Sequence, residues 1–206
     1  MKIRHIDLID FVPIINNPGP KTLLHIGCGT ASASRLPECF KTNSWKEIRL
    51  DIDPIAKPDI VSDITDMFAV GTNSMDAVWS SHNLEHLDRH QIPIALKEIY
   101  RVLKPGGFVL ITLPDLAKIA ALIVEGNVDK VLYLSPAGPI TPMDMLYGHQ
   151  KSIERGKTYM AHRTGFTSKQ LSNALLEAGF DEVRVMHGYS YDLWSVAVRN
   201  TVDINK

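Results

Sequence analysis

Short apolar segments alternate with longer segments of helical periodicity along most of this chain, and no other feature limits its fold as strongly. Alternating strands and helices form a mostly parallel sheet with helices on both faces. The expected strands are 22–26, 48–52, 59–61, 76–80, 108–113, 182–186 and 193–198, and the expected helices are 31–40, 91–103, 116–125 and 168–178. A chain of 206 residues is long enough for one such domain and too short for two. We therefore expect a single doubly wound α/β domain over residues 1–206.

The helix expected over residues 91–103 has the clearest periodicity in the chain. Its apolar residues recur as on one face of a helix. They are Ile92, Ala95, Leu96, Ile99, Val102 and Leu103. The segment Lys104-Pro105-Gly106-Gly107 should end this helix, because proline cannot continue it and glycine suits the turn. The last residues, 200–206, are expected to fray.

Residues 135–167 are rich in Pro, Gly, His and Tyr and show no clear periodicity. A long irregular segment inside a compact domain usually serves as a lid or a binding loop. We therefore interpret residues 115–167 as an insertion at the substrate site. It would act as a lid, as a contact surface in a homodimer, or as both.

Two glycines follow the first expected strand at its carboxyl end. Gly27-Cys28-Gly29 lets the backbone pass close to a ligand, and the helix after it can present free N–H groups. Asp51 lies in the second expected strand, 22 residues after Gly29. A carboxylate at that place can accept hydrogen bonds from both hydroxyls of a ribose. Together the two features predict a site for a nucleoside-containing cofactor.

The glycine pattern favours an adenosine cofactor over a dinucleotide. Dinucleotide sites prefer Gly or Ala at the sixth position of the turn, where the helix packs near a pyrophosphate. This chain has Ser32 there. A cofactor without a pyrophosphate does not need the small residue.

Several motifs, in this order, resemble those of the class I S-adenosylmethionine-dependent methyltransferases of the small-molecule type. They are Leu24-His25-Ile26-Gly27-Cys28-Gly29, Asp51, Val61-Ser62-Asp63-Ile64, Met75-Asp76-Ala77-Val78, His82-Asn83-Leu84-Glu85-His86, and the run from Glu98 to Gly107 that contains Arg101-Val102-Leu103-Lys104-Pro105-Gly106-Gly107. The resemblance covers roughly residues 20–115 and part of the C-terminal region. Residues 160–167 and Asp192-Leu193-Trp194 are similar to a bacterial branch of the family.

This resemblance implies a Rossmann-like, seven-stranded sheet whose last strand is antiparallel, with S-adenosylmethionine lying across the carboxyl ends of the early strands. The residues implied at the cofactor are Ile26, Gly27, Cys28, Gly29, Asp51, Ile52, Asp63, Ile64, Ser81 and His82. Asp63 would face the adenine amino group, and Ile52 and Ile64 would sandwich the ring. The alternatives are a helix N-cap for Asp63 and ordinary core positions for the two isoleucines.

Methyl transfer requires the protein mainly to align a nucleophile and to exclude water. A base is needed only for a protonated nucleophile, and the candidates are His82, His149 and His162. The residues expected at the substrate are Asn83, Tyr147, Tyr159 and Arg163. Each histidine of the insertion has an alternative interpretation as a partly buried or surface residue without a catalytic role. His86 is interpreted as structural, and we expect no resident metal.

Two other functions fit parts of the sequence. His82-x-x-Glu85-His86 matches an inverted zinc-peptidase motif, but a zinc hydrolase needs a third ligand and leaves the glycine turn and Asp51 unexplained. A second alternative is a protein that binds the cofactor without catalysis and serves as a sensor or a partner subunit, because a fold does not fix a function.

Net charge, absent motifs and cysteine count limit the kinds of acceptor and the cellular compartment that we expect. A formal net charge of −1 gives no sign of a nucleic-acid partner, and no apolar run is long enough to span a membrane. No Asn/Asp-Pro-Pro-aromatic segment follows the fourth strand, and no Pro-Cys nucleophile is present, so methylation of DNA bases is disfavoured. With only two cysteines, the expected compartment is the reducing cytoplasm. We expect methylation of an oxygen or nitrogen of a small molecule.

Overall fold

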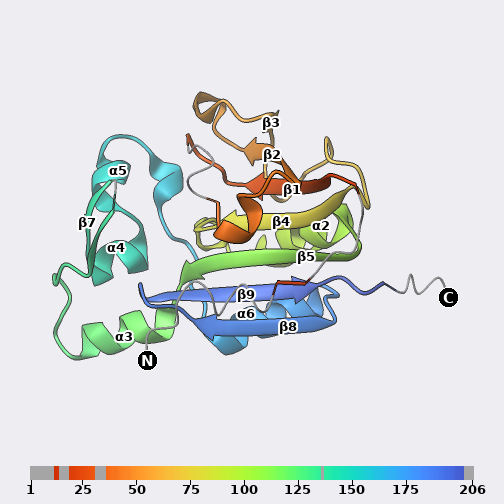
Figure 1. Ribbon diagram of the computed structural model, residues 1–206. Coiled ribbons are helices and arrows are strands. Elements are labelled where there is room, and N and C mark those ends of the chain that lie inside the picture. The colour runs from red at the N-terminus through yellow and green to blue at the C-terminus, as the bar shows by residue number, and fades with distance from the viewer. Residues whose placement is uncertain (1–11, 14–18, 31–35, 136, 202–206) are drawn as a thin grey trace.

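The computed structural model describes residues 12–13, 19–30, 36–135 and 137–201 of the chain. Its centre is a sheet of seven strands in the order β3-β2-β1-β4-β5-β9-β8 (Figure 1). The strands are β1 (Lys21–Ile26), β2 (Trp45–Asp51), β3 (Ile60–Val61), β4 (Met75–Ser81), β5 (Leu103–Pro114), β8 (Glu182–His187) and β9 (Asp192–Val198).

The strand directions confirm the expected Rossmann-like sheet. β1 pairs in parallel with both β2 and β4, β2 pairs in parallel with β3, and β4 pairs in parallel with β5. The last strand, β9, is antiparallel to both of its neighbours, β5 and β8. The strand order reverses between β1 and β4, and ligands of open α/β sheets bind outside the carboxyl ends of the strands at such a point.

Two helices, α2 (Ile92–Val102) and α6 (Ser168–Glu177), pack on one face of the sheet. The apolar side of α2 is buried at the positions expected from its periodicity. Thr167 and Gln170 form a reciprocal capping box that fixes the start of α6. On the opposite face, Phe40 of the short 3-10 helix η2 (Glu38–Phe40) stacks on Phe108 at 5.9 Å between ring centroids. Residues 31–35 of the helix expected over 31–40 lie outside the described residues.

β5 is longer than expected: it begins at Leu103, whereas the sequence predicts a start at Phe108. The segment Lys104–Gly107 was expected to be only a turn. The N–H of Gly106 donates to the carbonyl of Arg199, and the N–H of Arg199 donates to the carbonyl of Gly107. These bonds continue the strand pairing through the glycines, and the helix expected over 91–103 is observed over 92–102.

The region between β5 and α6 contains more regular structure than the sequence indicated. Its elements are α3 (Leu116–Val124), the hairpin β6 (Tyr133–Ser135) and β7 (Gly138–Ile140), α4 (Pro142–Tyr147), α5 (Gln150–Glu154) and the 3-10 helix η5 (Thr158–Met160). Ile119, Ile140 and Met145 form a small apolar core of their own. Figure 1 shows α4, α5 and β7 beyond the carboxyl ends of β4 and β5. Among the described residues, no helix is both long and apolar enough to cross a membrane.

Candidate active site

The glycine turn after β1 and the end of β2 are joined by hydrogen bonds to one carboxylate. Oδ2 of Asp51 accepts from the N–H of Gly29 at 2.7 Å, and Oδ1 accepts from the N–H of Asp53 at 2.9 Å. A carboxylate has about four acceptor positions, so these two bonds leave capacity for ribose hydroxyls. Asp51 thus fixes the shape of the turn at the place where the sequence predicted the cofactor.

Gly27 lies at the open side of this turn, close to the segment that follows β4. Its φ of 61° is left-handed, and the residue is exposed. A Cβ atom at Gly27 would lie 2.7 Å from Cγ and Nδ2 of Asn83. The side chain of Asn83 therefore rests on the glycine turn, so the structure places this expected substrate residue beside the cofactor residues.

The other expected cofactor residues divide into exposed and buried groups. Ile52 is 57 % exposed, which excludes the alternative of an ordinary core position, whereas Ile64 is 6 % exposed and belongs to the main core. Oδ1 of Asp63 accepts from the N–H and the hydroxyl of Thr65, both at 2.8 Å, so Asp63 closes a local turn. Ile26 and Cys28 are buried, and burial raises the pKa of the Cys28 thiol. These two residues contribute packing and backbone groups.

His82, just after β4, forms a pair with Glu85 of the 3-10 helix η4 (Leu84–His86). Nδ1 of His82 lies 3.2 Å from Oε1 of Glu85, and His82 has the left-handed φ of 50°, which is uncommon outside glycine. Desolvation works against the charged imidazole, but the hydrogen bond and charge of Glu85 outweigh it and raise the pKa of His82 above its usual value. Burial of Glu85 is likewise outweighed by its histidine neighbours, which lower the pKa of its carboxyl.

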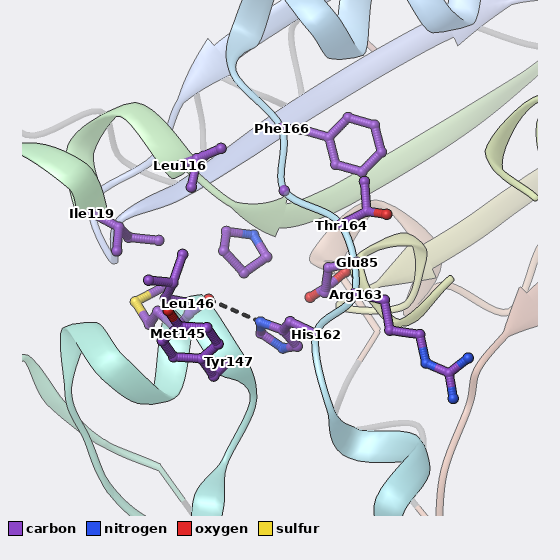
Figure 2. A pocket seen from close by; sticks show the side chains of 12 residues that line it. Glu85, Leu116, Ile119, Met145, Leu146, Tyr147, His162, Arg163, Thr164 and Phe166 are labelled. Atoms are coloured by element: carbon purple, nitrogen blue, oxygen red, sulfur yellow. Dashed lines mark hydrogen bonds between the residues drawn. The ribbon is translucent and has the colours of Figure 1, made fainter. Parts of the chain in front are cut away.

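A pocket of about 250 Å³ lies between this segment, the end of β5 and the insertion (Figure 2). Its wall is mostly apolar, and its charged or ionisable residues are Glu85, Tyr147, His162 and Arg163. The lining residues are Glu85, Pro114, Leu116, Ile119, Met145, Leu146, Tyr147, His162, Arg163, Thr164, Gly165 and Phe166. An apolar cleft with a few convergent polar groups is the usual form of a small-molecule site.

The segment that follows η5 brings His162 to this pocket. The N–H groups of Arg163 and Thr164 donate to the carbonyl of Glu85 at 2.8 and 3.1 Å. Nδ1 of His162 hydrogen-bonds to the carbonyl of Met145 at 2.8 Å, as the dashed line in Figure 2 shows. Burial lowers the pKa of His162, although the charge of Glu85 acts in the opposite direction.

The remaining expected residues are not all at the pocket. Tyr147 and Arg163 line it, and Nη1 of Arg163 pairs with Oδ2 of Asp88 at 3.1 Å. The hydroxyl of Tyr159 donates to Oδ2 of Asp53 at 3.1 Å, which places it on the cofactor side. His149 is buried against the hydroxyl of Ser152 and does not line the pocket.

The geometry required by the inverted zinc-peptidase motif does not form. That motif needs its two histidines on one helix face, whereas η4 has only three residues and His82 lies outside it. His82 hydrogen-bonds to Glu85 instead.

The sequence interpretation missed the apolar wall of the pocket, notably Leu116, Ile119, Met145 and Phe166. Phe166 lies within residues 160–167, which stand out in the sequence only for their similarity to a branch of the methyltransferase family. The other three occur in helices whose apolar residues look like ordinary core in a sequence, so no local signal distinguishes them.

Comparison with known proteins gives the same fold and a family match. Residues 24–111 match the model of a family described as a methyltransferase domain. A SAM-dependent methyltransferase from Archaeoglobus fulgidus superposes with a TM-score of 0.62 and 17 % identity, over 95 % of this chain and 92 % of that one. No curated protein sequence matches the chain.

Two further solved structures are similar at the level of the fold. The 1,6-didemethyltoxoflavin-N1-methyltransferase of Burkholderia thailandensis, solved with its substrate and S-adenosylhomocysteine, has a TM-score of 0.55 and 16 % identity, over 88 % of this chain and 72 % of that one. A protein from Bordetella parapertussis, described as possibly exported, has a TM-score of 0.60 and 16 % identity and matches 95 % of this chain. This chain spans 65 % of the length of the Bordetella protein.

Proposed function

Because residues 24–111 match the model of a methyltransferase domain family, and the sheet has the fold of S-adenosylmethionine-dependent methyltransferases, we propose that this protein methylates an oxygen or nitrogen of a small molecule. The family gives the enzyme class and its cofactor. We infer the acceptor, its reacting atom and the roles of individual residues from the two sites described above.

One observation carries the proposal. Asn83 and Glu85 are two residues apart in the segment after β4, and they face two different sites. Asn83 rests on Gly27 of the glycine turn, while Glu85 lines the pocket. A cofactor on the turn and an acceptor in the pocket would therefore meet across this segment, as methyl transfer between them requires.

The residues around the glycine turn fit S-adenosylmethionine. The backbone of Gly27 is exposed at the turn, and Asp51 supplies a carboxylate at the place of the ribose. Ile52 is apolar and exposed beside them, so covering it with an adenine ring would bury apolar surface. When bound, the cofactor supplies a methyl group that is activated by a positively charged sulfur.

The pocket fits a small acceptor. Its volume of about 250 Å³ lies just below the usual range for ligand sites, which begins at about 300 Å³, so the acceptor should be small. His162 offers a ring nitrogen that can hydrogen-bond to a polar substituent, and the apolar wall can pack against the rest of the acceptor. Of the three histidines expected to be catalytic, we assign only His162 to the acceptor side, because His82 pairs with Glu85 and His149 lies elsewhere.

Isothermal titration of the protein with S-adenosylmethionine and S-adenosylhomocysteine tests the cofactor site. We expect a dissociation constant of about 1 μM, equivalent to about 8 kcal/mol. Asp51→Asn should weaken binding about tenfold or more, because the amide repels one of the N–H donors and loses the charge. Asp129→Asn, at an exposed turn, is the matched control. Absence of binding to the wild-type protein would refute the proposal.

Methyl transfer to a panel of small hydroxyl- and amine-containing compounds tests the acceptor site. Labelled S-adenosylmethionine should pass its methyl group to at least one member of the panel, and His162→Ala should reduce that transfer. Cofactor binding without transfer to any acceptor would support the alternative of a sensor or partner subunit.

A further inference from the structure

Three metal-binding side chains meet at the edge of the acceptor pocket. Glu85 and His86 follow each other in η4, and His162 comes from the end of the insertion. One ligand atom from each of the three lies within 4.8 Å of the other two. Figure 2 shows the Glu85 carboxylate beside the ring of His162. Two of these residues line the pocket, so the group borders the space assigned to the acceptor.

Both histidines make the kind of second hydrogen bond that metal-binding histidines make. Nδ1 of His86 lies 3.1 Å from the carbonyl oxygen of Ala161, and Nδ1 of His162 lies 2.8 Å from that of Met145. A carbonyl only accepts, so each Nδ1 must carry the proton and each Nε2 keeps its lone pair. Metal-binding histidines almost always donate their second ring N–H in this way, because the bond fixes the tautomer and the ring orientation.

The carboxylate of Glu85 lacks a partner on one side. Glu85 is 1 % exposed, and its Oε1 is bound by His82. Its Oε2 is buried and has no hydrogen-bond partner among the described residues. A buried carboxylate oxygen without a partner is costly, and a cation next to it would remove that cost. Glu85 therefore has a carboxylate oxygen available to a cation, and the carboxylate belongs to the same close group as the two histidines.

We propose that Glu85, His86 and His162 bind a divalent transition-metal ion at the edge of the pocket. Two imidazoles and one carboxylate form a ligand set of catalytic zinc sites, and the same set suits other first-row ions better than Mg²⁺ or Ca²⁺. Ligand atoms around zinc are about 3.3 Å apart, so small side-chain rotations would close the group. Three protein ligands leave one coordination position open, and the pocket lies beside it.

The role of the ion rests on the proposed function. An oxygen of the acceptor would occupy the open position, so the ion would orient it toward the glycine turn. Coordination lowers the pKa of a hydroxyl, so the acceptor would release its proton to solvent without direct transfer to a side chain. The oxygen then forms its bond to the methyl carbon as the bond between that carbon and sulfur breaks.

Metal binding by the full chain tests the site directly. After dialysis against a chelator, the protein should bind about one equivalent of Zn²⁺ by calorimetry and elemental analysis, and Co²⁺ should give the visible absorption of a four- or five-coordinate ion. His162→Ala and Glu85→Gln should each weaken Zn²⁺ binding about tenfold or more. His90→Ala, at an exposed histidine close to the same segment, should bind like the wild type.

Circular dichroism and thermal unfolding of the metal-free variants separate loss of the site from loss of the fold. A wild-type protein that binds no Zn²⁺ or Co²⁺, or folded His162→Ala and Glu85→Gln variants that bind as tightly as the wild type, would overturn the site. Titration of the metal-free protein with S-adenosylmethionine keeps the two proposals apart. Metal binding without cofactor binding refutes only the proposed function, and the reverse result refutes only the metal site.

Discussion

Gly27 has a left-handed backbone conformation and lies close to the side chain of Asn83. Each of these two properties disfavours replacement of the glycine by a residue with a side chain. Gly27→Ala would strain a φ of 61° and press a Cβ against the side chain of Asn83 at 2.7 Å. We expect this variant to lose about 1–2 kcal/mol of unfolding free energy. Its affinity for S-adenosylmethionine should fall about tenfold or more, as calorimetry would detect, because Asn83 must move into the cofactor surface.

The matched control is Gly126→Ala, which has a φ of 80° but no atom within 4 Å of its added Cβ. It should show the backbone strain without the loss of affinity. Unchanged affinity in Gly27→Ala would mean that the cofactor does not approach this turn.

At the residue scale, the sequence carries more local signals for the cofactor side than for the acceptor side. Gly27 and Asp51 could be found because a turn and a strand end have local signatures. Asn83 was expected at the substrate, yet its side chain lies on Gly27. The approach of His162 to Glu85 joins segments that are far apart in the chain, and no local pattern specifies such a contact.

Asp76 joins three neighbouring strands at the amino end of β4. Its Oδ2 accepts from the N–H and hydroxyl of Thr22 on β1 and from Nζ of Lys104 on β5, each at 2.8 Å. Burial works against the charged form, but these bonds and the charge of Lys104 lower the pKa of Asp76 below 3.8. The contribution to stability is therefore present above that value and is lost as the pH falls through the folded-state pKa.

We expect Asp76→Asn to reduce the free energy of unfolding by about 1–3 kcal/mol at neutral pH. Urea unfolding at a series of pH values should show the difference from the wild type shrinking below about pH 4, where this carboxyl begins to protonate in the unfolded chain. A difference that stays constant down to acid pH would show that charge is not the source of the effect. Asp129→Asn, which is exposed, should have little effect at any pH.

The insertion depends on a close backbone contact at Gly148, between α4 and α5. Its φ is 91°, and an added Cβ would meet the carbonyl oxygen of Met160 and lie 3.0 Å from the backbone N of His162. We expect Gly148→Ala to displace the segment that carries His162 and to cost about 2–4 kcal/mol. Hydrogen exchange should increase in residues 138–164, while cofactor binding should persist because Gly27 and Asp51 are unaffected.

Gly156→Ala provides the comparison for this variant. Gly156 has a similar φ of 88° and nothing within 4 Å of its added Cβ, so only backbone strain of about 1–2 kcal/mol applies. Equal exchange in the two variants would show that the contact with Met160 does not hold the insertion in place.

At the element scale, periodicity predicted the long helices and the buried strands but not the structure of the insertion. The apolar face of α2 is evident because it spans several turns. β6 and β7 have three residues each and α4 has six, too few for a period to emerge. The start of α4 still carried a signal, since Thr141 and Asp144 form a capping box ahead of an apolar segment.

The whole molecule should become more stable when S-adenosylmethionine binds, because a ligand of the native state alone shifts the unfolding equilibrium. At about 100 times its dissociation constant, the gain is about 2.7 kcal/mol. For a domain of this size that corresponds to a rise of roughly 5–10 °C in the unfolding temperature, as differential scanning calorimetry would detect. Gly27→Ala should show a much smaller rise at the same concentration. An unchanged wild-type transition would contradict cofactor binding.

Asn83 and Glu85 lie on one short stretch of backbone, so a movement of this stretch would alter both the glycine turn and the pocket. If a molecule on the turn shifts this stretch, the affinity of the pocket changes as well. Thermodynamic reciprocity then requires the pocket's occupant to change the affinity of the turn by the same factor. S-adenosylhomocysteine, the product bound at the turn, would thus change the affinity of the pocket for the acceptor. An acceptor analogue in the pocket would in turn change the affinity of the turn for S-adenosylhomocysteine.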